Sequence, residues 1–321
     1  MRRALLVGID GYPDAPLTAC CNDARRLGEV LARNADHSIN WFTTVKLARQ
    51  PDVTNILRVD LLGLLDDLFD ARGEDVLFYF SGHALNTPWG PELSTQEGTQ
   101  PGMGVPFSNL MAMVNTSKAD SVTIILDCCF AGDLATALPG APLGLGQHET
   151  ATLRENVAIL AAAADDQEVA VSHQYSTFTS LLLDGLLGGA SDQRGRVTAL
   201  SLYSHAWSAM IDGSAKPQLK ANCAELPVLR TSDPWARLAS FHKLTELFPT
   251  EDARIVLEHS SLDTSMGDPP EELIVLTELN AASLVESGSA HSIESAVRHQ
   301  ISIGLNRPGR YYWRLVSRGL L

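Results

Sequence analysis

Cysteine is scarce in this chain of 321 residues, which contains only five. They form two adjacent pairs and one single residue, namely Cys20-Cys21, Cys128-Cys129 and Cys223. An odd number does not suit a disulfide framework, and the absence of any C-x-x-C spacing removes the usual signature of a structural zinc site. Each cysteine is therefore either a buried apolar side chain or a reactive thiol. We expect no metal and no cofactor.

Positive charge is also in short supply. The chain has 24 Lys and Arg against 38 Asp and Glu, which gives a formal net charge of −14. A nucleic-acid coat protein or a binder of anionic membranes needs the opposite sign, so we expect neither nucleic acid nor a membrane among the partners. A cationic substrate or partner is compatible with this charge. Hydrophobic residues make up 45% of the chain, which excludes global disorder.

Long apolar runs are missing too. No stretch approaches the roughly 18 apolar residues of a membrane-spanning helix. The first apolar run, residues 4–9, ends at Asp10 and is shorter than the core of a signal peptide, so we interpret it as a buried strand. These absences predict a cytoplasmic protein.

Two common catalytic signatures are absent as well. The segment Gly8-Ile9-Asp10-Gly11 follows the first apolar run, but it is neither a Walker A loop nor a G-x-G-x-x-G turn. No G-x-S-x-G nucleophile elbow occurs anywhere in the chain. A nucleotide-binding α/β domain is therefore a weak alternative, and a serine hydrolase is disfavoured.

Short apolar runs alternate with helical patterns over the first two thirds of the chain. The predicted strands are residues 4–9, 41–46, 76–80, 122–126 and 157–161, and the predicted helices are residues 19–33, 55–69, 176–187 and 198–211. Strands that are apolar on both faces and separated by helices indicate a parallel sheet covered on both sides. For the helix over residues 55–69 we expect Asp52 or Thr54 as the N-cap. The predicted fold class is α/β, with a mainly parallel central sheet flanked by helices.

Two long polar segments interrupt this pattern. Residues 84–104 follow His83 directly, and residues 133–153 follow the Cys128-Cys129 pair. Loops of this length inside a compact domain are usually functional or flexible. Both leave the carboxyl end of a predicted parallel strand, which is where open α/β sheets build their sites. The sequence therefore predicts the functional site at this edge.

Two short motifs stand at the ends of two buried strands: Ser81-Gly82-His83 and Asp127-Cys128-Cys129. A thiol nucleophile needs a base within hydrogen-bond reach and backbone N–H groups that stabilise an oxyanion. A glycine beside each candidate lets the backbone approach a substrate closely. Taken singly, His83 is better explained as a strand-end histidine whose hydrogen bonds are satisfied, and Cys129 as a buried filler. Their joint placement favours a catalytic pair.

The Ser-Gly-His-Ala motif at 81–84 and the Asp-Cys-Cys-Phe-Ala-Gly-Asp motif at 127–133 resemble the two active-site motifs of caspase-like cysteine peptidases, family C14. Among these, the bacterial caspase homologues and metacaspases are most similar. Softer landmarks are Cys20-Cys21-Asn22-Asp23-Ala24, Ile159-Leu160-Ala161-Ala162, Phe178-Thr179 and Lys216-Pro217-Gln218. The resemblance covers residues 1–230 and implies a caspase-like sandwich.

The resemblance implies a role for each motif residue. Cys129 would be the nucleophile and His83 the general base and acid, with an oxyanion hole formed by the backbone N–H groups of Cys129 and Gly82. Cys128 would point to the other face of its strand and pack. An idle homologue that serves as an adaptor is the alternative, and the intact Cys129, His83 and glycines argue against it.

Metacaspase-like enzymes line the pocket for the residue before the cut with two carboxylates and a hydroxyl. Asp23, Ser81 and Asp127 match those positions. Two carboxylates favour a guanidinium or ammonium group, so we expect a protein or peptide substrate with Arg or Lys before the cut. The alternative for Asp23 is a helix cap, and for Asp127 an orienting contact to His83.

A preference for Asp before the cut is the alternative specificity. Enzymes with that preference need cationic pocket residues, and Arg25 and Arg26 lie close to Asp23 in the sequence. They also carry Gln at the position of Asp127, which favours the basic preference.

Calcium binding and autoprocessing are two regulatory features of the family that the chain resembles. Between residues 84 and 120 the only acids are Glu92, Glu97 and Asp120, so we do not expect the calcium site found in many metacaspases. Autoprocessing in the family often occurs after the cysteine motif, where Arg154 is the only Lys or Arg between residues 133 and 193. Cleavage after Arg154 is one hypothesis, and an ordinary surface arginine is the other.

The predicted domains are a caspase-like peptidase domain over 1–230 and a regulatory or interaction region over 231–321. Residues 298–321 hold five Arg and no acid. The helical spacing of Tyr312, Leu315, Val316 and Leu320 favours a packed terminal helix over a nucleic-acid surface. We expect this region to bind a protein regulator. The resemblance also implies a regulated effector, for instance in bacterial defence or stress responses.

Overall fold

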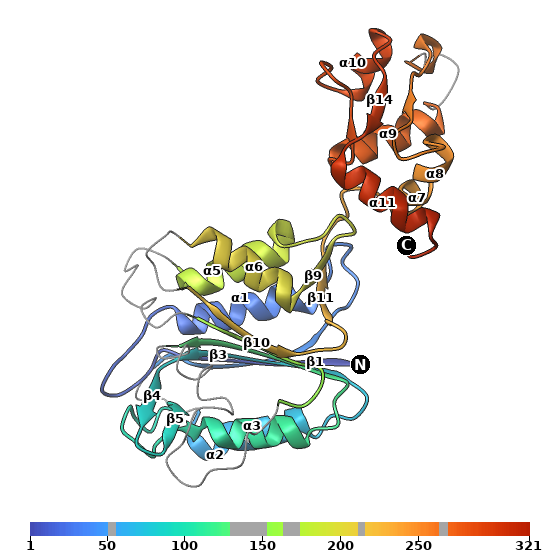
Figure 1. The fold of residues 1–321 in the computed structure, drawn as a ribbon. Coiled ribbons are helices and arrows are strands. Elements are labelled where there is room, and N and C mark those ends of the chain that lie inside the picture. The colour runs from blue at the N-terminus through green and yellow to red at the C-terminus, as the bar shows by residue number, and fades with distance from the viewer. Residues whose placement is uncertain (51–55, 129–152, 163–173, 211–215, 263–268) are drawn as a thin grey trace. The chain divides into compact units, whose positions relative to one another are not determined.

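The structure is a computed structural model that describes residues 1–50, 56–128, 153–162, 174–210, 216–262 and 269–321 (Figure 1). The chain divides into two units, each with a hydrophobic core of its own. The first comprises Met1–Ser191 and Arg196–Ser232, and the second comprises Asp192–Gly195 and Asp233–Leu321.

A six-stranded sheet forms the centre of the first unit. Its order is β10 (Gln218–Asn222), β8 (Val157–Ala161), β7 (Ser121–Cys128), β3 (Asp75–Gly82), β1 (Arg2–Ile9) and β2 (Phe42–Ala48). All neighbours pair in parallel except β10, which runs antiparallel to β8. The interior strands are apolar on both faces because both faces are covered. The prediction of a mainly parallel sheet is confirmed.

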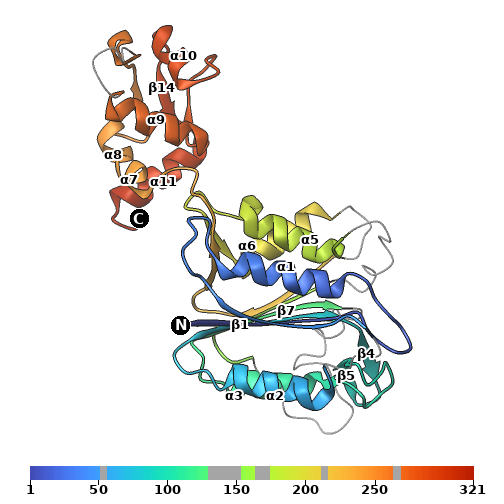
Figure 2. The same cartoon turned by 180° about the vertical axis from the view of Figure 1, so that it is seen from behind.

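Helices cover the two faces of this sheet, as Figures 1 and 2 show. The helices α1 (Cys20–Ala32), α5 (Thr177–Asp184) and α6 (Ala199–Ala209) lie on one face, and α2 (Arg58–Phe69) and α3 (Phe107–Thr116) lie on the other. In α1 the buried residues Ala24, Leu27 and Leu31 recur at helical spacing. This sandwich confirms the predicted α/β class.

The start of α2 differs from the sequence-based expectation. Asp52 and Thr54, the expected caps, lie outside the described residues, and the N-cap position is Leu57. Its backbone N–H donates to Asp60 Oδ2 at 3.0 Å, and the N–H of Arg58 donates to Glu97 Oε2 at 2.7 Å. The helix end is capped partly from a distant segment, which local sequence patterns do not reveal.

The expectation of an irregular loop over residues 84–104 is wrong. The chain there forms a small antiparallel sheet with the strands β4 (Ala84–Thr87), β5 (Gly90–Leu93) and β6 (Val105–Pro106). Ala84, Leu93 and Val105 are buried and hold this sheet to the core. Its strands are too short to show an alternating pattern. The second predicted loop lies outside the described residues up to residue 152.

Smaller elements complete the first unit. The predicted helix over 176–187 is α5 followed by the π-helical turn η1 (Gly185–Gly189), in which Gly188 has a φ of 134°. The strands β9 (Arg196–Thr198) and β11 (Val228–Thr231) form a two-stranded antiparallel sheet that was not predicted.

The second unit packs short helices around a three-stranded sheet. The helices are α7 (Leu238–His242), α8 (Leu244–Leu247), α9 (Glu271–Ala281), α10 (Ile293–Arg298) and α11 (Arg307–Ser317), with the 3-10 turn η2 (His259–Leu262). The sheet order is β12 (Arg254–Ile255), β14 (Ile303–Leu305) and β13 (Val285–Glu286). Phe241, Phe248 and Leu276 are completely buried in its core.

The terminal helix α11 is packed, as predicted. The indole Nε1 of Trp313 donates to the carbonyl oxygen of Phe248 at 2.7 Å. Arg310 pairs with Asp252 at 2.9 Å, and Arg314 pairs with Glu251, so two of the arginines have acidic partners. Leu320, which the helical spacing placed on the packed face, lies beyond the helix end and is 67% exposed. Among the described residues, no helix is both long and apolar enough to cross a membrane.

Candidate active site

The carboxyl ends of β1, β3 and β7 bring the predicted site residues to one edge of the sheet. The parallel register pairs Gly8 with Ser81, Ser81 with Asp127, and Gly82 with Cys128. Side chains at paired positions of neighbouring strands share a face. Ser81 and Asp127 therefore lie side by side, on the face that α1 covers with Asp23.

His83 follows β3 directly and is half-buried. Its imidazole Nε2 lies 2.8 Å from the carbonyl oxygen of Ala15. A carbonyl oxygen only accepts, so Nε2 carries the proton and Nδ1 is left as the basic nitrogen. Ala15 therefore orients this histidine. Sequence reasoning missed this contact because a backbone carbonyl leaves no signal in the residue type.

Tyr12 holds the backbone of His83. The N–H of His83 donates to Tyr12 Oη at 3.0 Å, and the two rings lie 4.7 Å apart between their centroids. A Cβ atom on Gly82 would lie 2.4 Å from Tyr12 Oη, so only glycine fits beside this hydroxyl. The requirement for Gly82 thus has a physical reason other than the substrate approach inferred from the sequence.

Cys129, the predicted nucleophile, lies outside the described residues. Its neighbour Cys128 ends β7 and is 2% exposed in the main core, as predicted for the cysteine of the other face. The oxyanion roles of Gly82 and Cys129 stay predictions.

The three predicted pocket residues are buried together. Asp23 is completely buried, and Ser81 and Asp127 are nearly so. The hydroxyl of Ser81 donates to Asp23 Oδ2 at 3.3 Å. The register places Asp127 beside Ser81 on the next strand. The sequence therefore selected three side chains that the fold does bring together.

Asp10, rather than Asp23, caps α1. The backbone N–H groups of Cys20 and Cys21 donate to the two carboxylate oxygens of Asp10 at 2.9 and 3.3 Å. A carboxylate at this end of a helix also interacts favourably with the helix dipole. The alternative role of Asp23 as the cap is therefore not needed.

Ser176 and Thr179, at the start of α5, complete the carboxylate cluster, and sequence reasoning did not select them. The backbone N–H of Ser176 donates to Asp23 Oδ1 at 3.1 Å, and its hydroxyl donates to Asp127 Oδ2 at 2.5 Å. The hydroxyl of Thr179 donates to the same oxygen at 2.6 Å. Asp127 thus bonds to α5 and to Tyr79, at 3.4 Å, in place of the orienting contact to His83 weighed from the sequence.

The two carboxylates perturb each other. Burial, reinforced by the nearby Asp127, raises the pKa of Asp23 to about 8. Burial also raises the pKa of Asp127, while the hydroxyls of Ser176, Thr179 and Tyr79 oppose that rise by hydrogen bonding to the anion. Near neutral pH the Asp23–Asp127 pair therefore retains a proton. A cation that binds beside the pair would favour release of this proton, which restores the second negative charge.

The remaining charged candidates lie elsewhere. Arg25 and Arg26 are partly exposed on α1, and both pair with Glu29, at 2.7 and 3.0 Å. Arg154 is half-buried, and its guanidinium donates to the carbonyl oxygens of Val114 and Ala119, each at 3.0 Å. Neither arrangement brings a cation to Asp23.

Two of the three acids considered for calcium, Glu92 and Glu97, have other partners. Glu92 Oε2 accepts from the N–H of Gly102 at 2.9 Å, and Glu97 caps α2 through Arg58. Within the part of the chain that the structure describes, no cluster of three or more His, Cys, Asp and Glu side chains could hold a metal ion.

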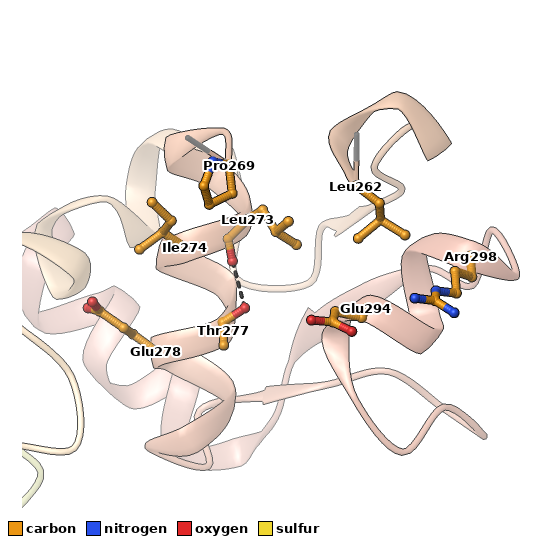
Figure 3. Close-up of a pocket in the computed structure, with 8 residues that line it drawn as sticks. All are labelled: Leu262, Pro269, Leu273, Ile274, Thr277, Glu278, Glu294 and Arg298. Atoms are coloured by element: carbon orange, nitrogen blue, oxygen red, sulfur yellow. Dashed lines mark hydrogen bonds between the residues drawn. The ribbon is translucent and has the colours of Figure 1, made fainter. Parts of the chain in front are cut away.

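A separate pocket of about 460 Å³ lies in the second unit (Figure 3). It is lined mainly by Leu262, Pro269, Leu273, Ile274, Glu294 and Arg298. The neighbouring Glu278 is already engaged by Arg237 at 2.7 Å and by Ser240 at 2.6 Å. No nucleophile or base of the predicted site belongs to this pocket.

Comparison with known proteins agrees with the geometry of the first unit. The caspase domain of peptidase family C14 matches residues 1–232, which is more than half of the chain. No curated protein sequence matches it. The family match supports a protease-like function of the hydrolase class. The family match, together with the central sheet and the helices that cover it, shows that the chain belongs to the caspase-domain family.

Proposed function

We propose that this protein is a cysteine endopeptidase that cleaves protein substrates after Arg or Lys. The observation that carries this proposal is the pair of buried carboxylates, Asp23 and Asp127, held together at the sheet edge where His83 lies. Burial of two acids without a cation is costly, and a site that tolerates this cost is suited to a cationic ligand.

The chemistry follows from the roles of the two motifs. Nδ1 of His83 takes the proton of the Cys129 thiol, and the thiolate attacks the carbonyl carbon of the scissile bond. Backbone N–H groups of Cys129 and Gly82 stabilise the oxyanion. The imidazolium returns the proton to the leaving amine, and a water molecule, deprotonated by His83, then hydrolyses the thioester.

The charges around the pocket support a basic residue before the cut. A guanidinium or ammonium group would neutralise the Asp23–Asp127 pair, and a guanidinium can do so bidentately. An aspartate in the same place would add a third carboxylate. Arg25 and Arg26, the cations that would suit an aspartate, are paired with Glu29 instead.

Hydrolysis of two fluorogenic peptides, one ending in Arg and one in Asp, tests the proposal. The wild type should cleave the Arg peptide, and Cys129→Ala should abolish this activity. Cleavage of the Asp peptide instead would contradict the pocket assignment. If neither peptide is cleaved, a thiol-reactive Arg-peptide probe that fails to label Cys129 would favour an idle adaptor.

We also propose that the second unit binds a protein regulator, as in an effector of a bacterial defence or stress response acting in the cytoplasm. The second unit has a hydrophobic core of its own, which includes Phe241 and Phe248. A separate core supports a module with a separate function. Co-purification of the full chain from its native host, compared with a chain truncated after residue 232, would test this. A partner retained by both forms would contradict it.

A further inference from the structure

A tyrosine hydroxyl is inserted into a backbone pairing at His83. The antiparallel pairing of β4 with β5 matches Ala84 with Leu93, so the next pair outward is His83 with Ser94. The N–H of Ser94 donates to the carbonyl oxygen of His83 at 2.9 Å. In such a pair the return bond normally runs from one N–H straight to the opposite carbonyl. Here the His83 N–H donates to Tyr12 Oη at 3.0 Å, and the Tyr12 hydroxyl donates to the Ser94 carbonyl at 3.2 Å.

The direction of each bond in this bridge is fixed. A backbone N–H can only donate and a backbone carbonyl can only accept. The group between His83 and Ser94 must therefore accept one bond and donate another, and a hydroxyl does both. A phenylalanine at position 12 would keep the ring but not the hydroxyl, so the bridge between the two backbone groups would be lost.

The tyrosine itself is held rigidly. Tyr12 is completely buried, and its hydroxyl fills the space where a Cβ of residue 82 would lie. Its ring contacts the imidazole of His83 at a centroid distance of 4.7 Å. Ala15, three residues further along the same connection between β1 and α1, accepts from Nε2. One segment thus contacts both the backbone and the ring of His83.

We propose that Tyr12 is a positioning residue for His83, with its hydroxyl acting as a spacer between His83 and Ser94. This inference rests on the proposed peptidase function, in which His83 is the base. Without the hydroxyl the two strands can close to a direct N–H···O bond of about 2.9 Å, which displaces His83 toward Ser94. A displacement of about 1 Å in a catalytic group can reduce the rate by roughly 100-fold.

The variant Tyr12→Phe tests this inference in the full chain. With active sites counted by titration, kcat on the Arg peptide should fall at least 10-fold while KM changes less than 2-fold, because the carboxylate pocket is untouched. Tyr312→Phe is the matched control, since it removes a tyrosine hydroxyl that donates to Gln193 at 2.6 Å in the second unit. It should leave both constants unchanged. A purely structural role for Tyr12 predicts fewer active sites with an unchanged kcat.

A second measurement separates this inference from the proposed function. The rate at which iodoacetamide alkylates Cys129, followed by peptide mass spectrometry, reports activation of the thiol by His83. If His83→Ala leaves this rate unchanged, the proposed function fails and this inference fails with it. If His83→Ala slows alkylation but Tyr12→Phe does not, only the inference is overturned.

A rescue variant covers the case in which Tyr12→Phe does not fold. 4-Aminophenylalanine at position 12 carries a group that can both accept and donate a hydrogen bond. We expect it to keep kcat within about 10-fold of the wild type, so loss of activity from a folded protein would contradict the inference.

Discussion

The Nε2 atom of His83 donates a hydrogen bond of 2.8 Å to the carbonyl oxygen of Ala15. This bond makes Nδ1 the basic nitrogen, and among the described residues Asp127 bonds to Ser176 and Thr179 and so can serve the pocket instead. The acidic residues and the histidine are therefore separate in function although they share one sheet edge.

Binding of a cationic inhibitor should depend on pH through Asp23. Burial and Asp127 raise the pKa of Asp23 to about 8, so below that pH the carboxyl must lose its proton before the pair carries two charges. The affinity for benzamidine should thus rise by up to about 10-fold per pH unit up to pH 8 and then level off. Calorimetric titrations between pH 6 and 9 measure this. Asp23→Asn should bind more weakly and without that pH dependence; a dependence retained by Asp23→Asn would contradict the assignment.

The same carboxyl should make the folded state less stable as pH rises. Between about pH 4 and pH 8 the folded protein keeps a proton on Asp23 that the unfolded chain has released. The free energy of unfolding therefore falls over this window, by up to about 1.4 kcal/mol per pH unit from this group. Asp23→Asn should flatten the slope measured by urea denaturation. Asp66→Asn, exposed on α2, should leave it unchanged.

Gly82→Ala should destabilise the first unit, because the new methyl group would lie 2.4 Å from Tyr12 Oη. We expect a loss of about 1–3 kcal/mol in the free energy of unfolding. The loss should be smaller in a Tyr12→Phe background, where the hydroxyl is gone. A double-mutant cycle measures this coupling, and additive losses would show that the hydroxyl is not the obstacle.

Arg154 is expected to stabilise the end of α3. Its guanidinium joins the carbonyl oxygens of Val114 and Ala119, and burial lowers its pKa. Arg154→Ala should lower the free energy of unfolding by about 1–2 kcal/mol. Arg154→Lys should recover only part of it, because one ammonium does not replace the guanidinium fork. Equal stability of all three proteins would contradict this role.

Autoprocessing after Arg154 is a separate prediction. Because its side chain is hydrogen bonded, cleavage there requires the local contacts to open first, and it should be slower than cleavage of an Arg peptide. Sequencing the N-terminus of a small fragment should then give Glu155. An intact chain in a fully active preparation would contradict it.

The strands and the covering helices could be predicted because their patterns are local. Strands β3 and β7 are continuous apolar runs, and α1 shows apolar spacing within a few turns. Their parallel arrangement is enough to place Ser81 beside Asp127 and His83 at the same edge. The spacing of apolar residues that determines these elements extends over only a few residues, so it can be recognised in the sequence.

The contacts that complete the site could not be predicted in this way. Tyr12 lies 71 residues from His83, and Ser176 lies 153 residues from Asp23. The residue type at neither position predicts such a partner. Ser176, for example, is equally consistent with an ordinary helix cap. The sheet formed by β4, β5 and β6 was missed for a related reason: its strands are stabilised by the core beneath them more than by their own patterns.

The strand order also determines at which point of synthesis the proposed peptidase site can form. The interior strand β1 is made first, but its neighbour β3 follows only after β2 and α2, and β7 later still. A nascent chain that ends before β7 carries Asp23 and His83 but neither Asp127 nor Cys129. The cysteine, both acids and the serine that bonds to both acids come from segments spread over most of the first unit. A chain synthesised only halfway therefore lacks part of the proposed catalytic site. If the proposed function holds, peptidase activity can appear only when synthesis of the first unit is nearly complete.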